Sequence, residues 1–287
     1  MSRPKYIDPF SDTGFKAIFG KQGSSEEVIR HLLNALFTGQ PGFDPIEKVQ
    51  FINNERTREH EDDKTIIHDV MCTTEKGHRF IVEMQASYQR QFMGRAIYYV
   101  SRGVTDQARL GARSGEWKYD YAPVVGTFIA AHPIRELPEK VVTHGALSDL
   151  DSGKPIDLSV RYAFIQTSYF NKSEEECETE IDKLIYIIKN MATLNEIPFK
   201  ERENDVYEQI DQLAQYASLS VGERDRYDYE IKLRRDRACE LDTAFVEGET
   251  KVQKDVVKKM VSKGFDDETI CDILNISAEK LRYLRQP

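Results

Sequence analysis

The sequence is short of the features that mark several large classes of protein. Its four cysteines lie far apart and form no CxxC pair, so the usual zinc and redox motifs are absent and free thiols are expected. No stretch approaches the roughly 18 uninterrupted apolar residues of a membrane span. The N-terminal MSRPKYIDPF lacks the apolar segment of a secretory signal. We therefore expect a cytoplasmic protein with no membrane partner.

The chain also has no overall excess of positive charge. Its net charge of −9 argues mildly against a nucleic-acid partner. Residues 1–110, however, hold 15 basic and 15 acidic residues, whereas residues 171–211 hold 5 against 12. The acidic excess thus belongs to a later region, and a bound divalent cation would offset some acids of the first part. A nucleic-acid partner for the first part stays open.

Length and hydrophobic patterning predict one substantial core followed by helices. The chain has 287 residues, of which 40% are hydrophobic and 31% charged, as in an ordinary soluble protein. We expect a core over residues 1–170, a helical accessory region over 171–262 and a small helical hairpin tail over 263–287. The tail has the length of a helix-turn-helix but lacks a basic second helix, so DNA contact and a packing or dimerisation role both stay open.

Local signals place the elements of the core. Ser11 or Asp12 begins a first helix that ends at Gly20, and Ser24 and Glu27 have the capping-box spacing for a second. Apolar periodicity predicts the remaining core elements, which are strands over 49–54, 65–73, 79–85, 123–131 and 160–170 and a helix over 91–111. The predicted later helices cover 175–195, 203–217, 223–262, 267–274 and 278–285.

The hairpin over 65–85 carries the most chemical information. Its turn, Glu75-Lys76-Gly77, suits a type I turn with glycine in the left-handed bulge position. In this register Asp69 stands directly opposite Glu83, with Cβ atoms about 4.5–5.5 Å apart. Two carboxylates so close repel one another unless a positive charge lies between them. A hard divalent cation with oxygen ligands is the usual solution.

Strand alternation gives the same result for Glu83. Ile81, Glu83 and Gln85 share one face of their strand, and Asp69 shares a face with Met71. A carboxylate among apolar neighbours in IVEMQ is costly unless it is paired or bound to a metal. This favours a metal role over that of a solvent-facing strand acid.

Several motifs resemble one known family. They are D-T-G-F-K-A-I-F (12–19), H-D-V (68–70), I-V-E-M-Q (81–85), F-M-G-R-A-I-Y-Y (92–99), E-G-E-T (247–250), K-G-F-D-D-E-T-I (263–270) and L-N-I-S (274–277). Their order is similar to the PD-(D/E)XK nuclease core, and most closely resembles the PD-(D/E)XK nuclease family transposases, or recombination-promoting nucleases. The resemblance implies an α/β, restriction-endonuclease-like core with a mixed central sheet flanked by helices, followed by a mostly helical C-terminal region. It also implies a metal-dependent DNA endonuclease that hydrolyses phosphodiester bonds and is linked to recombination or mobile elements.

By this resemblance, Asp69 and Glu83 would bind Mg²⁺, for which Mn²⁺ can substitute, and the Met84 carbonyl would be a further ligand. Gln85 stands where many relatives in the broader superfamily have lysine. Glutamine can only donate or accept hydrogen bonds, so more of the electrostatic work falls on the metal.

Other candidates surround this set. Asp12 and Lys16 match the N-terminal motif of the family and are expected to support catalysis, although Asp12 also suits a helix cap. Arg95, Tyr99 and Arg102 form a stripe on one helix face, which suits DNA phosphate contacts or ordinary packing.

Some alternatives remain. Glu27 matches a third acid but is better explained as a cap, His60 lies in a charged loop, and His68 points away from the Asp69 face. A non-catalytic DNA-binding or regulatory protein on a nuclease-like fold is the alternative function. The helical C-terminal region is a candidate homodimer interface.

Overall fold

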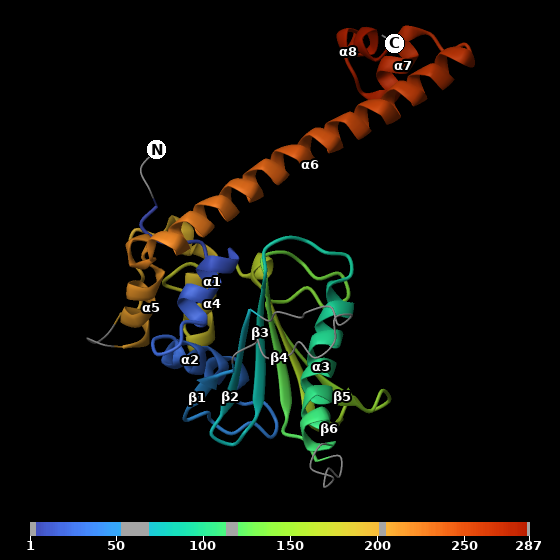
Figure 1. Ribbon diagram of the computed structural model, residues 1–287. Coiled ribbons are helices and arrows are strands. Elements are labelled where there is room, and N and C mark those ends of the chain that lie inside the picture. Colours follow the sequence, from blue (N-terminus) through green and yellow to red (C-terminus); the bar gives the residue numbers. More distant parts are fainter. Residues whose placement is uncertain (1–3, 53–68, 113–119, 201–204, 286–287) are drawn as a thin grey trace. The chain divides into compact units, whose positions relative to one another are not determined.

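The computed structural model describes residues 4–52, 69–112, 120–200 and 205–285. Two compact units divide the chain, Met1–Tyr227 and Asp228–Pro287. The first unit contains the sheet and the helices that pack on it, and the second contains most of a long helix and two short ones (Figure 1). His60, His68 and the other loop and strand residues predicted over 53–68 lie outside the described residues.

A mixed six-stranded sheet forms the centre of the first unit. Its spatial order is β1-β2-β3-β4-β6-β5, and the strands are β1 (Val49–Phe51), β2 (Val70–Thr74), β3 (Arg79–Gln85), β4 (Val124–Ala130), β5 (Val142–Ser148) and β6 (Pro155–Gln166). β3, β4 and β6 run parallel, and the other neighbouring pairs are antiparallel. Every residue of β4 is buried, as its apolar run predicts for a central strand.

The β2–β3 hairpin has the predicted register. Val70 pairs with Val82, and Met71 pairs with Ile81. Gly77 adopts a φ of +80° in the turn, the left-handed conformation that the turn residues predict. Because β2 is regular from Val70 onward, Asp69 lies at its first end, beside the last part of β3.

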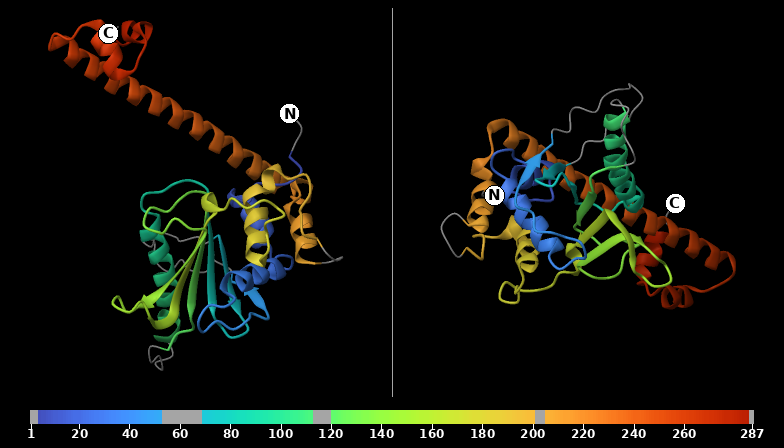
Figure 2. Two further views of the ribbon diagram at one scale, coloured as in Figure 1. Left: turned by 180° about the vertical axis from the view of Figure 1, so that it is seen from behind. Right: turned by 90° about the horizontal axis from the view of Figure 1, so that it is seen from below.

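Helices cover both sides of the sheet. α3 (Phe92–Ala112) lies along one face, and α1 (Asp12–Phe19), α2 (Glu26–Phe37), α4 (Glu180–Asn190) and α5 (Val206–Ala214) gather on the other side (Figures 1 and 2). Ile81, Val100 and Phe128 belong to the core between α3 and the sheet. A Cβ at Gly126 would collide with Val100, so glycine is what allows α3 to approach β4 this closely.

The helix starts confirm one of the cap predictions and contradict the other. Of the two predicted alternatives, Ser11 and Asp12, it is Ser11 that caps α1, because its Oγ accepts a hydrogen bond from the Gly14 amide at 2.9 Å. The capping box predicted from Ser24 and Glu27 was wrong, since α2 begins at Glu26 and has no side-chain cap. Glu27 instead accepts a hydrogen bond from Arg30 Nε at 2.9 Å, one turn further along α2.

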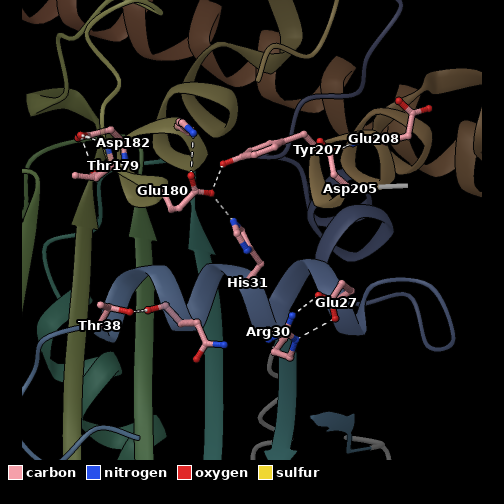
Figure 3. Close-up of polar contacts among 12 residues, drawn as sticks. Glu27, Arg30, His31, Thr38, Thr179, Glu180, Asp182, Asp205, Tyr207 and Glu208 are labelled. Atoms are coloured by element: carbon pink, nitrogen blue, oxygen red, sulfur yellow. Dashed lines mark hydrogen bonds and ion pairs between the residues drawn. The ribbon is translucent and has the colours of Figure 1, made fainter. Parts of the chain in front are cut away.

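A polar network joins the accessory helices to α2. Glu180 of α4 accepts a hydrogen bond from the Tyr207 hydroxyl of α5 at 2.7 Å, and His31 of α2 lies 2.9 Å from the same carboxylate oxygen (Figure 3). Lys183 binds the other oxygen of Glu180 at 2.9 Å. One carboxylate thus ties three helices together beside the sheet.

The remaining differences lie at the far edge of the sheet. β5 was not predicted, because its edge position leaves the sequence VTHGALS without strong alternation, and β6 begins at Pro155 rather than near residue 160. The later helices follow the prediction, with α6 (Val221–Ser262), α7 (Asp267–Leu274) and α8 (Ala278–Leu284). In the described part of the chain, no helix is long and apolar enough to span a membrane.

Candidate active site

Asp69 and Glu83 meet where β2 begins and β3 ends. The Asp69 amide donates a hydrogen bond to Glu83 Oε1 at 3.3 Å, and Asp69 Oδ2 accepts one from the Met84 amide at 2.8 Å. Glu83 is only 6% exposed. The hairpin register therefore places two carboxylates side by side in a largely dehydrated part of the sheet.

The surroundings of Asp69 oppose its ionisation. Burial raises the pKa of Asp69, and the negative charge of Glu83 raises it further, to about 7, against the opposing hydrogen bond from the Met84 amide. Removing water from a carboxylate and placing a second one beside it both penalise the charged form. A cation bound between the two acids would offset both the loss of water around Asp69 and the repulsion from Glu83.

α1 brings one acid and one base near this pair. Lys16 Nζ lies 2.7 Å from Asp12 Oδ1, one helical turn away. The charge of Asp12 contributes to the raised pKa of Asp69, and the charge of Lys16 opposes it. Both residues predicted from the N-terminal motif therefore lie within electrostatic range of the carboxylate pair.

Gln85 is a buried amide whose two ends are both engaged. Its Nε2 donates to the Ser87 carbonyl at 2.6 Å, and its Oε1 accepts a hydrogen bond from Arg95 of α3. A second nitrogen of Arg95 donates to Gln89 Oε1 at 2.8 Å. Gln85 thus fixes the position of a guanidinium group beside the end of β3.

Tyr99 lies one turn beyond Arg95 on α3. The Arg95 guanidinium lies 5.8 Å from the centre of the Tyr99 ring, within cation–π range. Burial raises the pKa of Tyr99, and the charges of Glu83 and Asp69 raise it further. Tyr99 therefore lies within electrostatic range of both Asp69 and Glu83.

Arg102 lies further along α3 than Arg95 and Tyr99 and pairs with an acid of the same helix. Its Nε lies 2.9 Å from Asp106 Oδ1 within α3. Asp106 also lies within electrostatic range of Arg79, at the opposite end of β3 from Gln85. The ion pair with Asp106 therefore places Arg102 on the part of α3 near the far end of the strand.

His132 was missed by the sequence analysis. It follows Ala131, the first residue after β4, whose amide donates to the Gln85 carbonyl at 3.0 Å, and its ring lies 5.7 Å from that of Tyr88. Burial lowers the pKa of His132. The available signal was its position directly after a buried strand, at the edge of a parallel sheet where sites commonly form.

The donors present fit a magnesium ion. Within the described residues, no three His, Cys, Asp or Glu side chains are grouped so as to hold a metal. Magnesium, however, commonly uses one or two carboxylates and takes its other oxygens from water and phosphate. The Met84 amide points toward Asp69, and the carbonyl of the same strand residue points to the same edge. The carboxylates of Asp69 and Glu83 are thus the oxygen donors that could serve as ligands here.

The fold and this site define a nuclease-like α/β protein, in which a mixed sheet presents an aspartate before β2 and an E-x-Q segment on β3. A family model described as PD-(D/E)XK nuclease family transposase matches residues 9–244, and the chain belongs to that family. No curated protein and no solved structure matches it. The resemblance inferred from the motifs is confirmed. Membership indicates a nuclease linked to mobile elements, and it implies a DNA partner and divalent-metal chemistry of the general PD-(D/E)XK kind.

Asp69→Asn removes a buried charge and keeps an acceptor for the Met84 amide. Because the folded-state pKa of Asp69 is raised, the parent protein loses stability as pH rises through about 7. In EDTA, the variant should therefore melt at least about 4 °C above the parent at pH 8. The difference should shrink steadily toward pH 4, and thermal unfolding followed by circular dichroism measures it.

Asp151→Asn is the matched control, because Asp151 is exposed in the turn between β5 and β6. Its melting temperature should follow that of the parent at every pH. Equal melting of the Asp69 variant and the parent at pH 8 would contradict the account of the buried pair.

Proposed function

We propose that the protein is a Mg²⁺-dependent DNA endonuclease that hydrolyses phosphodiester bonds. The observation that carries this proposal is the buried Asp69–Glu83 pair, in which burial and the charge of Glu83 make ionisation of Asp69 costly. Their carboxylates would hold the ion, with the Met84 carbonyl as a third ligand, and Mn²⁺ could replace Mg²⁺. When bound, the ion lowers the pKa of its water and neutralises charge that develops on the phosphate.

Arg95 supplies the positive charge that a lysine at position 85 would otherwise provide. A glutamine cannot carry charge, but Gln85 accepts a hydrogen bond from Arg95 and so holds the guanidinium in place. Guanidinium groups bind phosphate oxygens with two parallel hydrogen bonds. In this proposal Arg95 contacts the scissile phosphate, Gln85 positions Arg95, and Tyr99 packs against the guanidinium.

The residues on α1 and further along α3 have supporting roles. Lys16 favours the ionised form of Asp69, which is the form that binds a metal, and Asp12 holds Lys16 in position. Arg102 is proposed to contact DNA phosphates further along α3, where its ion pair with Asp106 competes with that contact. Its contribution is therefore expected to be smaller than that of Arg95.

Nicking of supercoiled plasmid tests the catalytic proposal. The parent should nick DNA in Mg²⁺ or Mn²⁺ and should stop in EDTA. Asp69→Asn and Glu83→Gln should each lower the rate at least about 10²-fold, because each removes a charge that holds the ion. Asp151→Asn, an exposed acid remote from the pair, should cut like the parent.

Two outcomes would defeat this proposal. One is nicking by Asp69→Asn at the parental rate, which would indicate a contaminant or another site. The other is salt-dependent DNA binding without cleavage in either metal, which would favour a non-catalytic DNA-binding or regulatory protein on this fold.

A double-mutant cycle tests whether Gln85 acts through Arg95. Arg95→Ala should lower kcat/KM about 10²-fold, as expected for the loss of one charge-stabilising donor. Gln85→Ala should cause a similar loss, and the double variant should lose little more than the larger single effect, because the two residues form one unit. Gln85→Ala with Arg102→Ala is the control pair and should be additive. Additive losses for Gln85 and Arg95 would show that they act independently.

We also propose that the helical C-terminal region forms a homodimer through α6. Leu241, Phe245 and Val252 are 62%, 71% and 62% exposed, and their spacing places them on one face of the helix. Apolar side chains at such intervals along a long helix suit pairing with a second helix.

Light scattering of the full chain tests this homodimer. Leu241→Lys with Phe245→Lys should reduce the mass from dimer to monomer, because two charges would face each other across the interface. Thr243→Lys with Thr250→Lys adds the same charge on the opposite face of α6 and should leave a dimer. A parent that is monomeric at all concentrations would refute the interface.

A further inference from the structure

The second compact unit carries a concentration of positive charge that the proposed active site does not use. Between residues 251 and 263, five lysines stand against a single acid, Asp255, in a chain whose net charge is −9. These lysines are Lys251, Lys254, Lys258, Lys259 and Lys263. Lys251, Lys254, Lys258 and Lys259 lie in the last turns of α6, which ends at Ser262, and Lys263 follows directly.

α8 packs beside this part of α6. Val257 of α6 is buried with Ile270 of α7 and with Leu281 and Leu284 of α8. The Ser277 hydroxyl accepts a hydrogen bond from the Lys280 amide and caps α8. A small apolar core therefore holds the three helix segments of this unit together (Figure 1).

A tyrosine between two lysines marks the junction of α6 and α8. Tyr283 is 51% exposed, and its ring centre lies 5.8 Å from Lys254 Nζ and 5.4 Å from Lys280 Nζ. Lys251 and Lys258 lie three residues before and four residues after Lys254, so they share its side of α6. Positive charge from two helices thus surrounds one exposed aromatic ring.

The positive charge of the second unit comes mainly from α6 and not from the second helix of the hairpin. A helix-turn-helix commonly carries such charge on its second helix, but Arg285 of the hairpin's second helix is bound to Asp267 at 3.2 Å. The structure places the end of α6 against that helix, and α6 supplies the lysines.

We propose that Lys251, Lys254, Lys258, Lys280 and Tyr283 form a second, sequence-independent DNA-binding surface. Closely spaced ammonium groups neutralise backbone phosphates and release counterions. An exposed aromatic ring among them can stack on a base or pack on a sugar. This surface needs neither Asp69 nor a metal, so it goes beyond the proposed hydrolytic activity and can be tested without it.

The test measures binding of the full chain to a labelled DNA duplex of about 30 base pairs in EDTA, by fluorescence anisotropy over a range of salt. Lys251→Gln with Lys258→Gln removes two exposed charges. It should flatten the dependence of log Kobs on log salt by about 1.8, because each lost phosphate contact contributes about 0.9. Affinity should fall equally on unrelated duplex sequences.

Three comparisons make the result decisive. Lys254→Gln with Lys280→Gln should flatten the slope by the same amount, whereas Lys140→Gln with Lys154→Gln, two exposed lysines of the first unit, should leave it unchanged. Asp151→Asn, an exposed acid of the first unit, should bind DNA as the parent does. Circular dichroism checks that each variant is folded. Parental slopes in both tail variants, or binding to anionic vesicles with none to DNA, would overturn the proposal.

Discussion

The repulsion between Asp69 and Glu83 is the constraint around which the site is arranged. It follows from backbone geometry, because the β2–β3 register brings the two positions together and Gly77 in the turn sets that register. Burial then makes the repulsion strong, since little water remains to screen it. The Met84 amide and the charge of Lys16 relieve part of the cost, and a divalent cation would relieve the rest.

The positive charge near Gln85 is carried by a residue of the neighbouring helix α3 and not by the strand residue itself. A lysine at this strand position would place an ammonium group directly beside the two acids. The neutral amide instead accepts a hydrogen bond from Arg95, so the positive charge comes from α3. Because the guanidinium is also held by Gln89 and lies over two aromatic rings, it is positioned more rigidly than a flexible lysine stem would be.

Local signals predicted the hairpin and the central strand, because the turn residues, the alternation around Glu83 and the apolar run of β4 each act over a few residues. The family motifs named Gln85 and Arg95 separately, but their hydrogen bond depends on how α3 packs on the sheet, which no local pattern encodes. β5 escaped prediction because an edge strand is only half-buried, so its sequence is weakly constrained. The lysines of α6 were visible in the sequence, but their position beside Tyr283 depends on the apolar core around Val257.

A nuclease with two acids at its centre faces an electrostatic problem before catalysis begins. Without a bound cation, the carboxylates repel the phosphate backbone, and a net charge of −9 adds to that repulsion at long range. A higher affinity for DNA at the site itself would require more positively charged side chains beside the metal ligands. These side chains would compete with the metal for the same carboxylates. Positive charge on a separate unit avoids this competition. Under the two proposals, the lysine surface binds DNA through phosphates alone, and cleavage requires an ion held by the two acids.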